Sequence, residues 1–354
     1  MLNRRNIITL LAGTILAGTS AMPAFAQDRL QVVATFSILG DLVRQVGGDR
    51  IALTTLVGPD GDGHVYSPRP SDARTLAESG VVFTNGLLYE GWIDRLIEAS
   101  GTEATIVTVA DGINAIADAG HDDHDDHGHS HDDHEHDHDD HGHSHDDHGH
   151  SHDDHGHDDH GHDDHGHDDH GHEHDDHAHG EFDPHAWQDV GNVKVYVANI
   201  RDALIAGDPD GADFYKANAE AYIAELAALD AEIRERVAAL PEAALVITSH
   251  NAFRYFTSAY GLAFDAPVGT TTEAEATARG AARLIDTIRA NNINSVFAES
   301  LTDARLIEQI AREADVPVAG TLYSDALSRP DGPAGTYIDM MRHNISLISE
   351  GLGS

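Results

Sequence analysis

The sequence predicts an α/β fold in which two lobes, with parallel-type sheets flanked by helices, are joined by one long rigid helix. Three observations predict it. Short apolar runs alternate with segments of helical periodicity along most of the chain, a pattern typical of parallel sheets covered by helices. One segment, residues 213–240, keeps a helical period throughout. Once a leader and a low-complexity segment are set aside, roughly 270 residues remain, enough for two ordinary lobes.

Residues 1–26 have the pattern of a secretory signal peptide. Two arginines precede the apolar run Ile7–Ala17, and the small-x-small motif Ala24-Phe25-Ala26 precedes Gln27. The apolar run is shorter than the ~20 residues that a transmembrane helix needs. We therefore expect cleavage near Gln27 and export of the mature chain.

The N-terminal lobe is predicted over residues 27–212. Its apolar runs indicate strands, and the periodic segments between them indicate helices. In chain order we expect the strand Leu30–Phe36, the helix Ile38–Val46, the strand Ile51–Val57, the helix Pro70–Glu78, the strand Val81–Thr84, a helix around Trp92–Ala99 and the strand Thr105–Val109.

Residues 213–240 form the predicted linker helix. Asp213 can cap its start and Pro241 ends it. About 27 residues at 1.5 Å each span roughly 40 Å, the width of a domain, so this helix could join two lobes rigidly. A coiled-coil partner helix is the alternative. Apolar residues recur every three or four positions, at Tyr215, Ala219, Tyr222, Leu226, Leu229, Ile233, Val237 and Leu240.

The C-terminal lobe is predicted over residues 241–354, where the alternation of strands and helices resumes at once. In chain order we expect the strand Leu245–Thr248, the helix Ala252–Ala259, the strand Leu262–Phe264, the helix Glu273–Ala290, the strand Ser295–Ala298, the helix Asp303–Ala314, the strand Val316–Gly320 and the helix Thr336–Leu352.

The composition limits the compartment and the partners. The formal net charge is −41, and 23 of the negative charges lie in residues 121–179, which leaves −18 for the rest of the chain. Nucleic acid and anionic lipid require Lys and Arg to neutralise phosphate, so neither is expected as a partner. There is no cysteine, and hence no disulfide, no thiolate metal site and no cysteine to carry a lipid. We expect a monomeric periplasmic protein without a lipid anchor.

Residues 121–179 form a low-complexity segment of 59 residues that holds 25 histidines and 23 carboxylates. It has no large apolar side chains to offset the cost of ordering its backbone, so we expect it to be disordered. Imidazole and carboxylate groups bind divalent metals, and the segment could collect, buffer or sense zinc; a dispensable acidic linker is the alternative. Weak sites are expected among residues such as His121, His124, His127, His129, His177 and His179.

Only four histidines lie outside this segment. His64 is in a Gly/Pro-rich stretch after a predicted strand, His185 follows the polar segment, and His250 directly follows the strand Leu245–Thr248. Ligands of open α/β sheets bind at the carboxyl ends of strands, so these three imidazoles could point into one cleft. His343 lies among apolar residues of the last predicted helix, and we expect it to be structural.

A carboxylate is the expected fourth member of such a site. Asp325 follows the predicted strand Val316–Gly320, and Glu299 directly follows Ser295–Ala298. Either residue could instead cap the helix that comes after it.

Several separated motifs together resemble the zinc- and manganese-binding components of bacterial metal ABC importers, and the resemblance covers essentially the whole mature chain. These motifs are His64-Val65-Tyr66, Pro68, Pro70-Ser71-Asp72, Asp183-Pro184-His185-Ala186-Trp187, Ser249-His250-Asn251-Ala252-Phe253, Glu299, Asp325 and Met340-Met341-Arg342-His343-Asn344.

The resemblance implies one metal ion in the cleft between the lobes, with two ligands from each lobe. It places the ligands at His64, His185, His250 and Asp325, with Glu299 behind them or as an alternative ligand. Manganese-binding relatives typically have glutamate as the third ligand, where this chain has histidine. Three imidazoles and one carboxylate suit tetrahedral zinc, whereas manganese favours more oxygen ligands. Zn²⁺ is therefore the expected metal, with copper and nickel left open.

The resemblance also implies a partner, an ABC-type permease in the inner membrane, with a periplasmic zinc chaperone as a second candidate. A periplasmic zinc store or chaperone independent of a transporter shares every sequence feature. A zinc hydrolase would need three ligands, an open water position and a base. The chain has neither a His-Glu-x-x-His helix nor a nucleophile elbow, so we expect a binding protein and no enzyme.

Overall fold

A computed structural model describes residues 29–118, 181–272 and 276–353 of the chain. The predicted signal peptide and the His/Asp-rich segment lie outside these described residues. Within the described ranges, no helix combines the length and the apolar character needed to cross a membrane.

The first half of the chain forms a four-stranded parallel sheet with the order β2-β1-β3-β4. Parallel neighbours cannot be joined by hairpins, so helices carry the chain back between the strands. The strands are β1 (Leu30–Phe36), β2 (Ile51–Val57), β3 (Val81–Thr84) and β4 (Thr105–Thr108), and the helices between them are α1 (Ser37–Gly47), α2 (Pro70–Ala77) and α3 (Ile93–Ser100).

The second half contains two smaller parallel pairs, β5-β6 and β7-β8. Strands β5 and β7 also contact each other, so the two pairs lie side by side. The strands are β5 (Leu245–Ile247), β6 (Ala263–Asp265), β7 (Val296–Glu299) and β8 (Val318–Leu322), and the helices around them are α6 (Arg254–Tyr260), α7 (Ala278–Ala290) and α8 (Ala304–Ala314).

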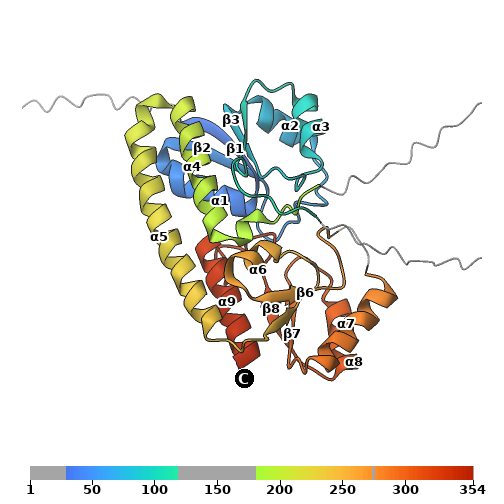
Figure 1. The fold of residues 1–354 in the computed structure, drawn as a ribbon. Helices are drawn as coiled ribbons and strands as arrows, with labels where there is room; N and C mark the ends of the chain where they lie inside the picture. The colour runs from blue at the N-terminus through green and yellow to red at the C-terminus, as the bar shows by residue number, and fades with distance from the viewer. Residues whose placement is uncertain (1–28, 119–180, 273–275, 354) are drawn as a thin grey trace, which may run out of the picture.

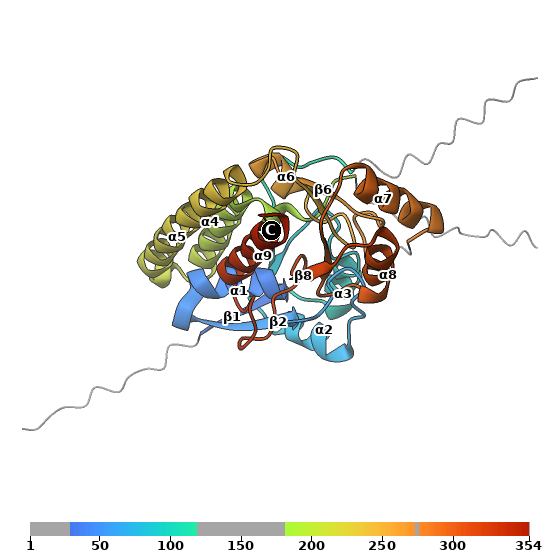
Figure 2. The same ribbon diagram turned by 90° about the horizontal axis from the view of Figure 1, so that it is seen from below.

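Three long helices pack alongside these regions: α4 (Val190–Gly207), α5 (Ala212–Ala238) and α9 (Tyr337–Gly353). In Figure 1, α5 runs along one side of the molecule from the level of β1 and β2 to the level of α9. Figure 2 shows α9 beside α5, with α1 next to it. The predicted α/β class with parallel sheets, flanking helices and one long helix is therefore confirmed.

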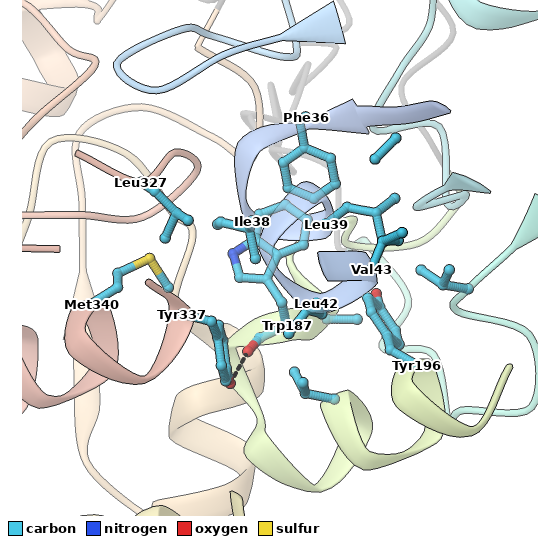
Figure 3. Packing of buried hydrophobic residues seen from close by; sticks show 14 of the residues in the cluster. Phe36, Ile38, Leu39, Leu42, Val43, Trp187, Tyr196, Leu327, Tyr337 and Met340 are labelled. Carbon is cyan, nitrogen blue, oxygen red and sulfur yellow. Dashed lines mark hydrogen bonds between the residues drawn. The ribbon is translucent and has the colours of Figure 1, made fainter. Parts of the chain in front are cut away.

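The principal apolar core is continuous between the two halves. It includes most of α1, the buried face of α5, and Leu327, Tyr337 and Met340 from the end of the chain. Figure 3 shows Leu327 and Met340 in the same cluster as Ile38 and Trp187. A second, separate core lies between α7, α8 and the strands β5 and β7.

The structure changes several predicted boundaries. The helix predicted over residues 273–290 begins at Ala278, because the Thr277 side chain accepts a hydrogen bond from Gly280 N and caps the helix there. Residues 273–275 lie outside the described residues. Asp213 does not cap α5; it lies in the first turn, and Gly211 occupies the capping position. A helix was expected to begin near His185, where the polar segment ends, but without bounds; α4 begins at Val190.

Candidate metal centre

His64 lies in the loop between β2 and α2. Its backbone N–H donates to Asp62 Oδ1 at 2.8 Å, which fixes the start of the turn. The imidazole packs edge-on against Tyr89, with ring centroids 4.6 Å apart. The indole of Trp92 donates to Gly63 O at 2.7 Å. The loop therefore holds His64 against the first half of the molecule.

His185 lies at the start of a short 3₁₀ turn that leads into α4. Asp183 Oδ1 accepts hydrogen bonds from both the backbone N–H and the ring Nδ1 of His185, at 2.9 and 2.8 Å. Because Nδ1–H donates to the carboxylate, Nε2 is left with its lone pair toward the cluster. Both side chains are fully buried.

His250 directly follows β5 and is held by Glu299 at the end of β7. Glu299 Oε1 accepts from the backbone N–H of His250 at 2.8 Å, and Oε2 lies 2.8 Å from His250 Nδ1. As at His185, a carboxylate behind Nδ1 directs Nε2 toward the cluster. In the described residues Glu299 thus lies behind His250 and does not cap a helix.

Asp325 follows β8 and is completely buried. Its Oδ2 lies 3.0 Å from His250 Nε2 and 3.8 Å from His64 Nε2, and its Oδ1 lies 3.4 Å from His185 Nε2. The 3.0 Å approach lacks the alignment of a hydrogen bond, and neither carboxylate oxygen has a hydrogen-bond partner among the described residues. An unpartnered buried carboxylate is costly unless a cation satisfies it.

The structure brings His64, His185, His250 and Asp325 into one cluster. One ligand atom from each lies within 4.8 Å of all the others. Four ligands around a tetrahedral zinc ion would be about 3.3 Å apart, given Zn–N bonds of about 2.0 Å. The shortest approaches of 3.0 and 3.4 Å in the cluster are close to this spacing. The donor set of three nitrogens and one carboxylate fits a divalent transition metal.

The electrostatics of the cluster favour the metal-binding protonation states of His64 and Asp325. Burial lowers the pKa of His64 to about 3, so its imidazole is neutral at physiological pH. Burial alone would raise the pKa of Asp325, but the imidazoles of His250 and His185 hold it well below the ordinary value. Burial would likewise lower the pKa of His250, but the carboxylates of Glu299 and Asp325 outweigh it and raise that pKa strongly. His250 therefore carries a proton that a bound cation would displace.

Apart from Glu299, sequence reasoning did not assign the residues that support the ligands. Asp183 belongs to the Asp183-Pro184-His185 motif, and its place two residues before His185 could have indicated a hydrogen bond to that imidazole. Tyr89 donates its hydroxyl to Asp325 O at 3.2 Å, and Trp187 donates its indole N–H to Ser324 O at 2.8 Å. Their partners are over 130 positions away, and no local pattern indicates such contacts.

The remaining histidines divide into two groups. His343 Nε2 lies 3.0 Å from Thr321 O, and its ring packs against Tyr323, away from the cluster. The histidines from His121 to His179 lie outside the described residues.

Comparison with known proteins gives a family match over nearly the whole chain. Residues 32–351 match the family described as the periplasmic component A of the zinc-uptake complex, ZnuA. The manganese-binding lipoprotein MntA of Halalkalibacterium halodurans is 30% identical over 92% of this chain and 89% of its own. The iron transporter lipoprotein MtsA of Streptococcus pyogenes is 28% identical over the same shares. The periplasmic zinc-binding protein TroA of Treponema pallidum has the same fold, with a TM-score of 0.72 and 23% identity over 92% of this chain and 99% of its own.

These relatives correct one expectation. MntA and MtsA are both named lipoproteins. The names of these relatives therefore contradict the expected absence of a lipid anchor. Their names also specify manganese and iron. Relatives thus differ in their metals, and the family match by itself supports a divalent metal without choosing one.

Proposed function

Since the chain belongs to the family of periplasmic zinc-uptake components and its relatives are binding components of ABC importers, we propose that it captures Zn²⁺ and passes it to an ABC-type permease. Zinc is the cargo, bound by His64, His185, His250 and Asp325. At the level of the family the role is solute binding, and we propose no catalytic step for this chain.

The observation that carries the proposal is the buried carboxylate of Asp325. Both of its oxygens lack hydrogen-bond partners among the described residues, while three imidazoles surround them. A bound divalent cation would satisfy the carboxylate and all three ring nitrogens at once.

The choice of zinc over manganese rests on the donor set. Three nitrogens and one carboxylate match the N-rich tetrahedral sites of zinc, and manganese prefers more oxygen donors. Glu299, which could add an oxygen, is directed to Nδ1 and the backbone of His250.

We further propose that residues 121–179 collect and buffer zinc in the periplasm near this site. Their density of histidines and carboxylates supplies many weak ligands. The segment would raise the number of bound zinc ions without forming the tight site.

A competitive zinc titration against a chromophoric chelator tests both the four-residue site and the role of residues 121–179. The mature protein without residues 121–179 should retain one tight equivalent, and His250→Ala should lose it. His343→Ala is the matched control, because this histidine lies outside the cluster, and it should keep the site. Absence of a tight site in the shortened protein would contradict the assignment to the cluster and make the segment itself the binding element.

Parallel titrations with Mn²⁺ test the metal. The shortened protein should prefer Zn²⁺, and His250→Glu, which replaces a nitrogen by oxygen, should reduce that preference. A wild-type preference for Mn²⁺ would contradict the zinc assignment while leaving the metal site intact.

A further inference from the structure

We propose that Asn85 is a positioning residue for His185: its side-chain amide holds the Pro184 carbonyl and so fixes the peptide group that directs this imidazole into the cluster. The inference rests on the proposed function, since His185 is one of the proposed zinc ligands. Asn85 directly follows β3, lies 99 positions before Pro184 and is completely buried. It is not itself a proposed ligand.

Unlike the other three proposed ligands, His185 does not lie in a loop directly after a strand. An isolated antiparallel bridge between Ala117 and Phe182 leads into its turn. The His185 backbone has φ −82° and ψ 41°, close to an inverse γ-turn, and Ala186 N–H closes this turn on Pro184 O at 2.9 Å. Because one bond closes so short a turn, the direction of the imidazole depends on the side chains that hold the turn from outside.

Two side chains fix the peptide group between Pro184 and His185 from its two polar ends. Asp183 Oδ1 accepts from the His185 N–H at 2.9 Å, and Asn85 Nδ2 donates to Pro184 O at 3.0 Å. The peptide group is planar, and the proline ring fixes the φ angle that precedes it. With both ends held, the plane cannot rotate, and the Cα–Cβ bond of His185 keeps its direction. Asn85 and Asp183 together therefore determine where Nε2 points.

The amide of Asn85 has one orientation that satisfies its neighbours. Its Nδ2 also donates to Gly86 O at 3.0 Å, and both this oxygen and Pro184 O only accept, so the NH₂ group must face them. The Tyr196 hydroxyl donates to Oδ1 at 2.7 Å. Burial raises the pKa of Tyr196 well above its ordinary value, so the hydroxyl keeps its proton. Tyr196 belongs to α4 and lies in the principal core with Trp187 (Figure 3), so a packed helix sets the direction of the Asn85 donor.

The backbone of Asn85 is held by the buried carboxyl group of Glu90. Oε1 accepts from the Asn85 N–H at 2.7 Å, and Oε2 accepts from the Gly86 N–H at 3.4 Å. The turn between them places Gly86, Leu87 and Leu88 at φ angles of 87°, 55° and 59°, a left-handed region that leucine rarely adopts. Strained backbone of this kind persists where its surroundings enforce it, and it is concentrated at functional sites. The strained turn accordingly has a role at the metal site, because it presents the Asn85 amide.

The zinc affinity of the full mature chain, measured by competition with a tight chelator, gives the first test. Asn85→Ala removes the donor to Pro184 O and should weaken the tight site about tenfold, at the lower end of the effect of losing an outer partner of a metal-binding histidine. Tyr196→Phe keeps Asn85 but releases its amide, and it should weaken the site about two- to fivefold. Because Tyr196 acts through Asn85, the double variant should bind no more weakly than Asn85→Ala.

Hydrogen–deuterium exchange of the zinc-free chain separates positioning from a general loss of stability. Asn85→Ala and Tyr196→Phe should both accelerate exchange in residues 185–189 by a larger factor than in α5, whose core amides report global unfolding. A contribution to general stability alone would accelerate exchange in both regions by the same factor.

Asn199→Ala is the matched control. Asn199 lies three residues after Tyr196 on α4, and its Nδ2 donates to Val109 O and Asp111 O, both at 2.9 Å. The variant therefore loses the same kind of bond away from the His185 turn. It should keep the wild-type zinc affinity and show no excess exchange in residues 185–189.

Wild-type affinity in Asn85→Ala, or an equal loss of affinity in Asn199→Ala, would overturn the inference. If Asn85→Ala does not fold, Tyr196→Phe decides: unchanged affinity and unchanged exchange in residues 185–189 would overturn it. The proposed function fails by a different result, a wild-type chain without a tight equivalent of zinc that His250→Ala removes. In that case the exchange experiment, which contains no zinc, still decides whether Asn85 holds the turn.

Discussion

The imidazole of His185 is oriented by a single carboxylate. Asp183 accepts from both Nδ1 and the backbone N–H, and Arg254 Nη1 is 3.9 Å from its second oxygen. Asp183 therefore fixes the tautomer and the direction of a proposed ligand without touching the metal.

Asp183→Asn should lower zinc affinity about 10- to 100-fold, the usual effect of removing a carboxylate behind a metal-binding histidine. The asparagine side-chain oxygen can still accept the hydrogen bond from His185, but it carries no negative charge to make the imidazole a stronger ligand. Chelator competition on the protein without residues 121–179 measures the change. Asp189→Asn is the control, because Asp189 only caps α4 and asparagine caps equally well. Equal affinities of the two variants would contradict the role of Asp183.

Glu90 is a second buried carboxyl group, and it supports the turn after β3. It accepts from the Thr35 hydroxyl and the Asn85 N–H, and Asn85 in turn donates to Pro184 O beside His185. Burial raises the pKa of Glu90 from 4.5 to about 7 despite these hydrogen bonds.

The folded protein should therefore lose stability as pH rises. A raised carboxyl pKa means that the folded state binds the proton more tightly, so this stabilisation is complete below about pH 4.5 and is lost as pH passes through about 7. The loss should be about 3 kcal/mol. Urea unfolding of Glu90→Gln between pH 5 and 8 should show a flatter profile than the wild type. Glu98→Gln, at an exposed position on α3, should leave the slope unchanged; a wild-type slope in Glu90→Gln would refute the assignment.

At the scale of elements, α5 is the part of the fold that periodicity predicts best. Six of the eight predicted apolar positions are buried, and Val237 and Leu240 pack partly buried against the same core. A regular stripe specifies a helix face because spacings of three and four place side chains on one side. The helix ends follow less directly from sequence, as the unused cap at Asp213 demonstrates.

Leu229→Ala should test the contribution of this stripe. Leu229 is fully buried, and removing its side chain should destabilise the protein by about 2 to 5 kcal/mol through lost burial and a residual cavity. Denaturant unfolding measures the difference. Ala228→Gln, on the exposed side of the same helix, should change stability by about 0.5 kcal/mol or less. Similar losses in the two variants would mean that the buried face does not stabilise α5.

Much of the candidate site could be predicted from sequence, for a physical reason. Three of the four proposed ligands, His64, His250 and Asp325, lie in loops after strands, and the carboxyl ends of parallel strands collect such loops at one edge. Helix α4 could be predicted less well, because the sequence before it is a long polar segment that gives no strand from which to count. The attachment of Asp325 to Tyr89 and Trp187 could not be predicted, because it depends on how two distant segments pack.

At the scale of the whole molecule, zinc should act as a clamp between the two halves of the chain. The proposed ligands come from both halves of the chain, so a bound ion would favour the folded state over the unfolded one. Free zinc at 1,000 times its dissociation constant should add about 4 kcal/mol. For a protein of this size, that corresponds to a rise in Tm on the order of 10 °C.

Thermal unfolding separates this clamp from the His/Asp-rich segment. The full mature chain and the protein without residues 121–179 should show the same rise in Tm, because the weak ligands of the segment do not form the tight site. His250→Ala should abolish the rise in both, and His343→Ala should preserve it. If the shortened protein lost the zinc-dependent rise, the segment would be the source of the stabilisation, and the four-residue cluster could not account for how the protein holds zinc.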